Sequence, residues 1–192
     1  ILKNSSIKES YNLLNPVLLK QKNNDINLKN LISFNISYLL ESDKYIITLK
    51  KIQEIDSIQI FKNFKICEDL KINIDFNLDF LEDMLLFNHK YSLSIFKNYQ
   101  ITDMVFCRNN INIIYILEGE ATIYLFNPKH KNEIKNGSLI DIKKYSHKYI
   151  LHKDNLLLIP PNWFYIEEIK VDTLQYHIDC DNYFTFLYNM IK

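Results

Sequence analysis

The most restrictive feature of this 192-residue sequence is its second half, which is a series of short apolar segments rich in Ile, Leu, Tyr and Phe. Each segment is bounded by charged residues, Asn or Pro, and each is short for a helix. This pattern predicts an almost continuous run of β-strands from Tyr91 onward. The predicted strands are YSLSIF (91–96), NINIIYIL (110–117), EATIYLF (120–126), SLIDI (138–142), NLLLIPP (155–161), FYIEEI (164–169) and TLQYHID (173–179).

The first 45 residues show a different pattern, in which apolar side chains recur at three- and four-residue steps. Such spacing places the apolar side chains on one face of a helix. It predicts a helix at residues 13–18, with Pro16 at its start or in a turn, and a second helix at residues 28–40. The rest of the chain predicts strands in KYIITLKKI (44–52) and DSIQIFKNF (56–64) and a short helix in DFNLDFLEDMLLF (75–87), whereas NYFTFLYNMIK (182–192) fits a strand or a terminal helix.

Helices followed by many short strands indicate an α+β fold whose core is a β-sandwich or barrel. No linker rich in Gly, Ser or Pro divides the chain, so we expect one integrated domain. Within it, residues 1–90 form a helical and β segment that covers a core made by residues 91–192. Several strands are apolar on both faces and need cover on both. The N-terminal helices are the natural cover for one outer face.

Composition argues against some classes of function. Lys and Arg together balance Asp and Glu, so no global field attracts nucleic acid. No apolar run reaches the roughly 18 residues of a membrane-spanning helix. We attribute the abundant Lys and Asn to an AT-rich genome. The widely spaced Cys67, Cys107 and Cys180 predict buried thiols rather than disulfides and fit an intracellular, reducing compartment, with the mitochondrion as an alternative for a processed chain.

Two stretches carry motifs with a more specific meaning: NINIIYILEGEATIYLFNP (110–128) and DNLLLIPPNWFYIEE (154–168). Together they resemble the cupin fold of the JmjC-like, 2-oxoglutarate-dependent oxygenases. The resemblance implies a double-stranded β-helix, the cupin jelly roll, with the N-terminal helices packed on it. The residues that match structural positions of the family pattern are Asn112, Gly119, Pro128, Asp154, Pro160 and Trp163, although Lys153 replaces a glycine.

The chemical positions of the same pattern are changed. The resemblance places the iron ligands of the first strand at Phe106 and Arg108 and the distal histidine at Tyr165. It places the lysine that binds 2-oxoglutarate at Ala121. Non-haem iron of this class needs two imidazoles and a carboxylate, which neither a phenyl ring nor a protonated guanidinium can replace. The resemblance therefore implies a degenerate site with no metal, no cofactor and no catalytic residue.

Arg108 is the only arginine in the chain and raises two alternatives. If the family register holds, Phe106 and Arg108 face inward together. The guanidinium then stands where the metal would be, paired with Tyr165, Glu118 or Glu120, because an unpaired buried charge is costly. If the register slips, Arg108 reaches solvent.

Two other sites stay open as alternatives. His177 and Asp179 form a His-x-Asp pair on one strand face, and with His147 or His152 they would make a displaced metal site for a diverged oxygenase. A pocket beside Ala121 and Arg108 would instead hold a small anionic ligand. Our leading expectation is a catalytically inactive cupin that acts as a structural or protein-interaction subunit of a larger assembly, with other protein subunits as its partners.

Overall fold

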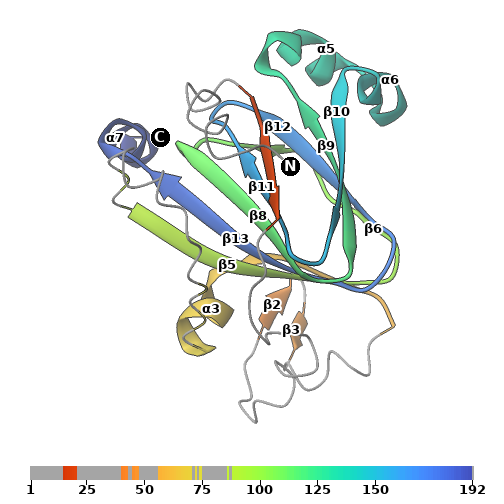
Figure 1. Cartoon of the computed structure of the whole chain (residues 1–192), viewed down its shortest axis with the longest axis vertical. Helices are drawn as coiled ribbons and strands as arrows, with labels where there is room; N and C mark the ends of the chain where they lie inside the picture. The colour runs from red at the N-terminus through yellow and green to blue at the C-terminus, as the bar shows by residue number, and fades with distance from the viewer. Residues whose placement is uncertain are drawn as a thin grey trace.

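The computed structural model describes residues 15–20, 40–42, 45–47, 56–70, 72, 74, 86 and 88–191, and its main body is a sandwich of two antiparallel β-sheets (Figure 1). The first sheet contains β1 (Val17–Lys20), β11 (Asn155–Ile159), β8 (Ile111–Glu118), β13 (Thr173–Asp181), β5 (Asn88–Lys97) and β4 (Ile58–Asn63), in that order. The second contains β10 (Ser146–His152), β9 (Glu120–Phe126), β12 (Phe164–Ile169) and β6 (Gln100–Ile101), with β7 (Val105–Phe106) also paired to β12. A separate hairpin joins β2 (Leu40–Ser42) to β3 (Tyr45–Ile47).

The order of the strands identifies the sandwich as a jelly roll. In the first sheet the last strand, β13, lies between the early strands β5 and β8. In the second sheet the late strand β12 lies between β9 and β6. Each late strand therefore returns to pair beside earlier ones, which is the doubled Greek key of a jelly roll. The predicted β-sandwich core is confirmed.

The space between the two sheets is filled by an apolar cluster, since inward positions alternate along each strand. Pro160 follows the last residue of β11, and Trp163, which is 2% exposed, lies in this cluster. The IPPNW segment therefore ends a buried strand and packs its tryptophan between the sheets. The other buried members of the cluster are Phe96, Cys107, Ile114, Ile116, Ala121, Ile123, Leu125, Leu151, Leu157, Ile159, Tyr165 and Ile169.

Strands β8 and β11 are buried on both faces, as their apolar sequences predicted. Strand β13 is also buried on both faces, although one of its faces carries polar side chains. On the outer face of the first sheet, Ile66 and Cys67 of α3 (Phe64–Leu70) pack into a second apolar cluster that includes Leu93 and Tyr115. This helix follows β4 directly, so part of the cover comes from the middle of the chain rather than from its first helices.

The predicted helix at residues 13–18 is wrong where the structure describes it, because Val17–Lys20 is strand β1. This short apolar segment pairs with β11 and supplies backbone hydrogen bonds to an edge that would otherwise lack them. The helices predicted at 28–40 and 75–87 lie outside the described residues, apart from Leu40 and Leu86. Leu40 begins strand β2 rather than ending a helix.

The outer face of the second sheet is covered by α5 (Lys131–Asn136) and α6 (Leu139–Lys143), whose Ile134 and Ile142 pack with Ile166. The strand predicted at 138–142 is therefore wrong. Helix α6 begins after Ser138, whose hydroxyl accepts a hydrogen bond from the N–H of Asp141. Serine and an acidic residue at this three-residue spacing form a helix N-cap, and that local signal outweighs the apolar pattern.

Three turns give a physical role to positions that the motif had singled out. Gly119 joins β8 to β9 at φ 85°, and a Cβ there would lie 2.2 Å from the carbonyl oxygen of Asp172, so only glycine fits. Asp154 joins β10 to β11 at φ 68°, and its carboxylate accepts a hydrogen bond from Tyr115 Oη at 3.0 Å. Asp tolerates this left-handed conformation. Pro128 begins the 3-10 helix η2 (Pro128–His130), where a missing N–H costs nothing.

The C-terminal stretch is helix α7 (Tyr183–Ile191), which decides between the two alternatives that its sequence allowed. Asn182 precedes it and caps its first turn, since the side-chain oxygen accepts a hydrogen bond from the N–H of Thr185 at 2.9 Å. In the part of the chain that the structure describes, no helix combines the length and apolarity needed to cross a membrane.

Candidate functional site

A row of polar side chains lies in the otherwise apolar core between the two sheets. On β13, His177 pairs in register with Ile114 and Gln175 with Ile116, and both isoleucines belong to the inter-sheet cluster. Alternate residues of a strand share a face, so Gln175, His177 and Asp179 all point inward. The predicted common face of His177 and Asp179 is confirmed. Opposite them, β12 contributes Tyr165 and Glu167; these five residues, each at most 8% exposed, are called the polar row below.

Lys62 brings a positive charge to this row. Its Nζ donates hydrogen bonds to Asp179 Oδ1 at 2.9 Å and Oδ2 at 3.1 Å, and the lysine side chain is only 15% exposed. A bulge in β4 makes this contact, because the pairing of β4 with β5 shifts between Ile60 and Asn63. Lys62 takes φ 48° there, which turns its side chain toward β13.

A second contact links the same bulge to His177. The backbone N–H of Lys62 donates to Ser94 Oγ at 2.9 Å, and Ser94 Oγ is hydrogen-bonded to His177 Nε2 at 2.8 Å. Burial, followed by the nearby Lys62 charge, holds the pKa of His177 well below its usual range. His177 is therefore a neutral imidazole whose Nε2 already has a partner, and Phe61 packs edge-on against its ring with the centroids 5.8 Å apart.

Glu167 is the one acid of the row that has no basic partner at hydrogen-bond distance. It is fully buried, and burial raises its pKa to about 7, although Gln175 and the Lys62 charge act in the opposite direction. Both carboxylate oxygens lack a hydrogen bond of normal geometry. A carboxyl group in such surroundings holds its proton near neutral pH.

Several neighbours of Glu167 also bury polar atoms without a hydrogen bond. Such atoms are unusual in folded proteins, where most buried polar groups are paired. The predicted structural residue Asn112 is among them: it lies on β8 in register with Asp179, and its Nδ2 has no partner. The other atoms of this kind that face the core are Ser92 Oγ, Tyr165 Oη, both amide atoms of Gln175, and His177 Nδ1.

The arrangement does not assemble the displaced metal site. The two histidines proposed as third ligand lie at the surface: His152 pairs its Nδ1 with Glu120 at 2.9 Å and its side chain is 64% exposed, while His147 is exposed beside Trp163. Asp179 is held by Lys62. Over the residues that the structure describes, no group of three or more His, Cys, Asp or Glu side chains could hold a metal ion.

The inward alternative for Arg108 is wrong, because Arg108 is exposed and Phe106 is 39% exposed. The backbone explains this. Cys107 donates its N–H to the carbonyl of Trp163 at 2.9 Å and accepts from the N–H of Asn162 at 2.8 Å. These bonds fix Cys107 in the inter-sheet core, and alternation then directs its two neighbours outward. Among the residues that the structure describes, Lys62 is the cation that reaches the polar row.

The remaining predicted positions lie in the core. Tyr165 is fully buried, and burial followed by the nearby Glu167 raises its pKa well above the usual value. Ala121 is also fully buried, within the apolar inter-sheet cluster. Since Arg108 is on the surface, the structure does not bring Ala121 and Arg108 together in a pocket for an anionic ligand.

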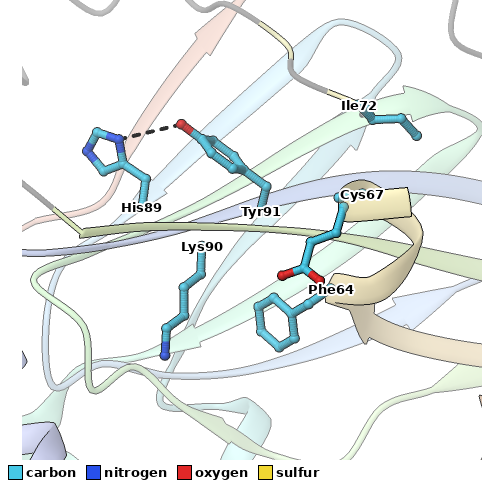
Figure 2. A pocket seen from close by; sticks show the side chains of 7 residues that line it. Phe64, Cys67, Ile72, His89, Lys90 and Tyr91 are labelled. Atoms are coloured by element: carbon cyan, nitrogen blue, oxygen red, sulfur yellow. Dashed lines mark hydrogen bonds between the residues drawn. The ribbon is translucent and has the colours of Figure 1, made fainter. Parts of the chain in front are cut away.

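A hollow of about 390 Å³ lies outside the sandwich, between α3 and β5 (Figure 2). Figure 2 shows His89 and Tyr91 on one side of β5 and Lys90 on the other, with Tyr91 Oη 3.5 Å from His89 Nδ1. Burial and Glu68 raise the pKa of the Cys67 thiol in its wall to about 12, so this cysteine is no nucleophile at neutral pH. The other lining residues are Phe64, Glu68 and Ile72.

Sequence reasoning missed Lys62, Ser94 and Glu167. For Glu167 a signal was available: the resemblance placed Tyr165 inside the barrel, and the residue two positions later shares its face. For Lys62 the alternation of Ile58 and Ile60 predicts the opposite face, because in a regular strand the lysine two positions after Ile60 would face the outer cluster. Only the bulge reverses it.

No protein-family model and no curated protein matches the chain. Among solved structures, a cupin superfamily protein from Desulfitobacterium hafniense is similar over 49% of this chain and 68% of its own, at 16% identity and a TM-score of 0.37. The coconut allergen cocosin is similar over 49% of this chain and 22% of its own, at 13% identity and a TM-score of 0.38. The order of strands in the two sheets of this chain shows a jelly roll, an architecture that cupins share with other proteins.

Proposed function

We propose that this chain is a catalytically inactive cupin-like protein that serves as a structural or protein-interaction subunit of a larger assembly. One observation carries the proposal: Lys62 Nζ donates to both carboxylate oxygens of Asp179, at 2.9 and 3.1 Å. The Lys62 ammonium compensates the negative charge of Asp179 inside the sandwich. In a metal site, the metal ion would compensate that charge. A metal bound by Asp179 would have to displace Lys62, and at His177 only Nδ1 would be available to it, since Nε2 is hydrogen-bonded to Ser94.

The surroundings support the same proposal. A lysine near a metal ligand adds unfavourable charge, because two cations close together in a poorly solvated core repel strongly. The predicted degenerate positions add to this, since Phe106 and Arg108 turn away from the core and Tyr165 offers a neutral phenol. His177 is neutral, and Glu167, with a pKa of about 7, keeps its proton below neutral pH, so these two groups add little charge for a cation to compensate.

The interaction role is supported by apolar side chains on the surface. Helix α7 exposes Phe184 (79%) and Met190 (69%) to solvent. Large exposed apolar residues that gather on one element mark a surface that contacts another protein.

Metal analysis of the purified 192-residue chain tests the proposal directly. We expect far less than one equivalent of iron, zinc or manganese, and no rise in melting temperature when these ions are added with 2-oxoglutarate. The matched variant is Lys62→Met, which frees Asp179 and would gain metal affinity if the lysine is what excludes the ion. Stoichiometric metal in the wild-type protein, bound at the His177–Asp179 pair, would refute the inactive state.

A further inference from the structure

Helix α7 is oriented with an apolar side toward solvent. Its exposed residues lie on one stripe at steps of three and four: Tyr183, Leu187 and Met190, with Phe184 and Tyr188 beside them. Its half-buried side carries the polar Thr185 and Asn189 together with Phe186. An ordinary surface helix has the reverse arrangement, because its apolar stripe packs on the core.

Polar contacts hold this orientation. Asn189 Nδ2 donates to Asp181 Oδ1 at 3.3 Å, and Asn182 Nδ2 donates to Asn110 Oδ1 at 3.2 Å. Asp181, only 2% exposed, also accepts from Asn88 and Asn109 through its other oxygen, at 3.3 and 3.0 Å. Side chains from three segments therefore fix both the start and the last turn of the helix on the sandwich, so the apolar stripe is presented by a defined structure.

The stripe is large enough for a protein contact. With aromatic side chains offering about 150–250 Å² each, the five residues at their exposures present on the order of 500–600 Å² of apolar surface. Two such stripes pressed together bury on the order of 1,000–1,200 Å², at the lower end of specific interfaces. Residues Tyr183–Ile191 include no charged side chain, so a second copy of the same helix meets no like-charge repulsion.

We propose that α7 is a homodimer interface, in which the exposed stripe of one protomer packs antiparallel on the same stripe of a second copy around a two-fold axis. The inference rests on the proposed interaction role and is independent of the state of the barrel core. A self-complementary surface is what two-fold symmetry requires, and homodimer interfaces are more apolar than those of transient complexes. Because the helix has no charged side chain, it offers no charge that a partner protein could recognise.

The test measures the mass of the 192-residue chain by light scattering during gel filtration, up to several hundred micromolar. We expect twice the 23.1 kDa chain mass at high concentration. The double variant Phe184→Glu/Met190→Glu should raise the dimer dissociation constant by at least about tenfold. Both residues are largely exposed, so the variant should fold, which circular dichroism checks. The matched control is Ile140→Glu: Ile140 is 86% exposed on α6, on the opposite side of the molecule from α7 (Figure 1).

A cross-link gives a second readout. The three native cysteines are buried and unpaired, so a Leu187→Cys variant would place an accessible thiol in the stripe. Oxidation should link two chains, whereas an Ile140→Cys variant should stay monomeric. A wild-type chain that is monomeric at every concentration, or a dimer that survives Phe184→Glu/Met190→Glu, overturns the homodimer. If a monomeric chain instead captures a different protein and the α7 variant loses it, the homodimer is wrong while the proposed interaction role stands.

Discussion

Lys62 Nζ lies within hydrogen-bond distance of both carboxylate oxygens of Asp179, 117 residues later in the chain. The two residues are not on neighbouring strands, since β5 lies between β4 and β13. The side chain therefore crosses the inner face of one strand to reach the next, and it joins the edge of the first sheet to the polar row. This contact is the most informative place to test how the core is stabilised.

Replacing Lys62 by Met should lower the free energy of unfolding by about 2–4 kcal/mol, because it leaves the Asp179 carboxylate buried without its partner. Urea denaturation at neutral pH measures the loss. Asp179→Asn in the same chain should recover part of it. The control is Lys170→Met, because Lys170 is 58% exposed and lies 3.9 Å from Glu168, so its loss should cost less than about 1 kcal/mol. Equal effects of the two lysine variants would contradict a structural role for the buried pair.

Glu167 and His177 should affect the pH dependence of stability in opposite directions. Glu167 has a pKa of about 7 in the fold against 4.5 for an unperturbed glutamate, so between these values the folded chain keeps a proton that the unfolded chain releases. Its contribution to stability therefore falls as pH rises from 4.5 to 7, by about 3 kcal/mol at most. His177 has a lowered pKa in the fold, so the unfolded chain gains a proton below pH 6.5 and stability falls as pH drops. Between roughly pH 4.5 and 6.5 the two slopes oppose each other.

Glu167→Gln separates these two effects. In the variant, the free energy of unfolding should no longer fall between pH 4.5 and 7 through Glu167. The increase of stability with pH that His177 causes should then be visible, so the stability of the variant rises with pH relative to the wild type. Urea midpoints at several pH values from 4.5 to 8 measure this difference. Glu168→Gln is the control on the same strand, since hydrogen bonding by Tyr124 lowers the pKa of Glu168. Parallel profiles for wild type and Glu167→Gln would show that Glu167 ionises as freely in the folded as in the unfolded chain.

Gly119→Ala should destabilise the β8–β9 turn by about 2–4 kcal/mol, because the new Cβ meets backbone atoms in a left-handed conformation. Gly137→Ala is the matched control. Its φ is −96°, and the nearest atom to a new Cβ is Ile142 Cγ2 at 2.6 Å, part of a side chain that can move. Thermal melts of both variants rank the two costs, and a smaller loss at Gly119 than at Gly137 would be inconsistent with this turn.

The cysteines should be unreactive in the folded protein. Cys67, Cys107 and Cys180 are at most 4% exposed, and burial raises the pKa of each thiol, to about 12 for Cys67 and Cys180. A thiol-specific reagent should label them at neutral pH only as fast as the chain unfolds. Rapid labelling of any of the three under native conditions would place that thiol nearer the surface than the fold allows.

The comparison between sequence and structure is clearest at β8 and β4. The continuous apolar run of β8 predicted a strand buried on both faces, and the strand has that environment because a sheet and its cover lie on either side. On β4 the same reasoning found the strand and missed its key side chain. The bulge at Lys62 depends on where Ser94 and Asp179 lie after folding, and no local pattern encodes that contact.

Arg108 illustrates the same limit in another way. A family pattern aligns residues along the chain. The face of the sheet that a side chain occupies depends in addition on the local backbone register, which a single hydrogen bond can shift. The two backbone bonds of Cys107 decide the register, and they involve Asn162 and Trp163, more than fifty residues away. The degenerate metal positions stay a prediction, and the buried cation that contacts Asp179 is Lys62 of β4 rather than Arg108.

The bulge of β4 also determines where the chain can be truncated without losing a core contact. All strands from β5 to β13 lie between Asn88 and Asp181, so a fragment starting at Asn88 would retain the whole double Greek key. It would nevertheless lack Lys62 and so leave the buried Asp179 carboxylate without its partner. Strand β4 therefore supplies a side chain that the jelly-roll core needs. A recombinant fragment should begin before Ile58 so that it includes this strand.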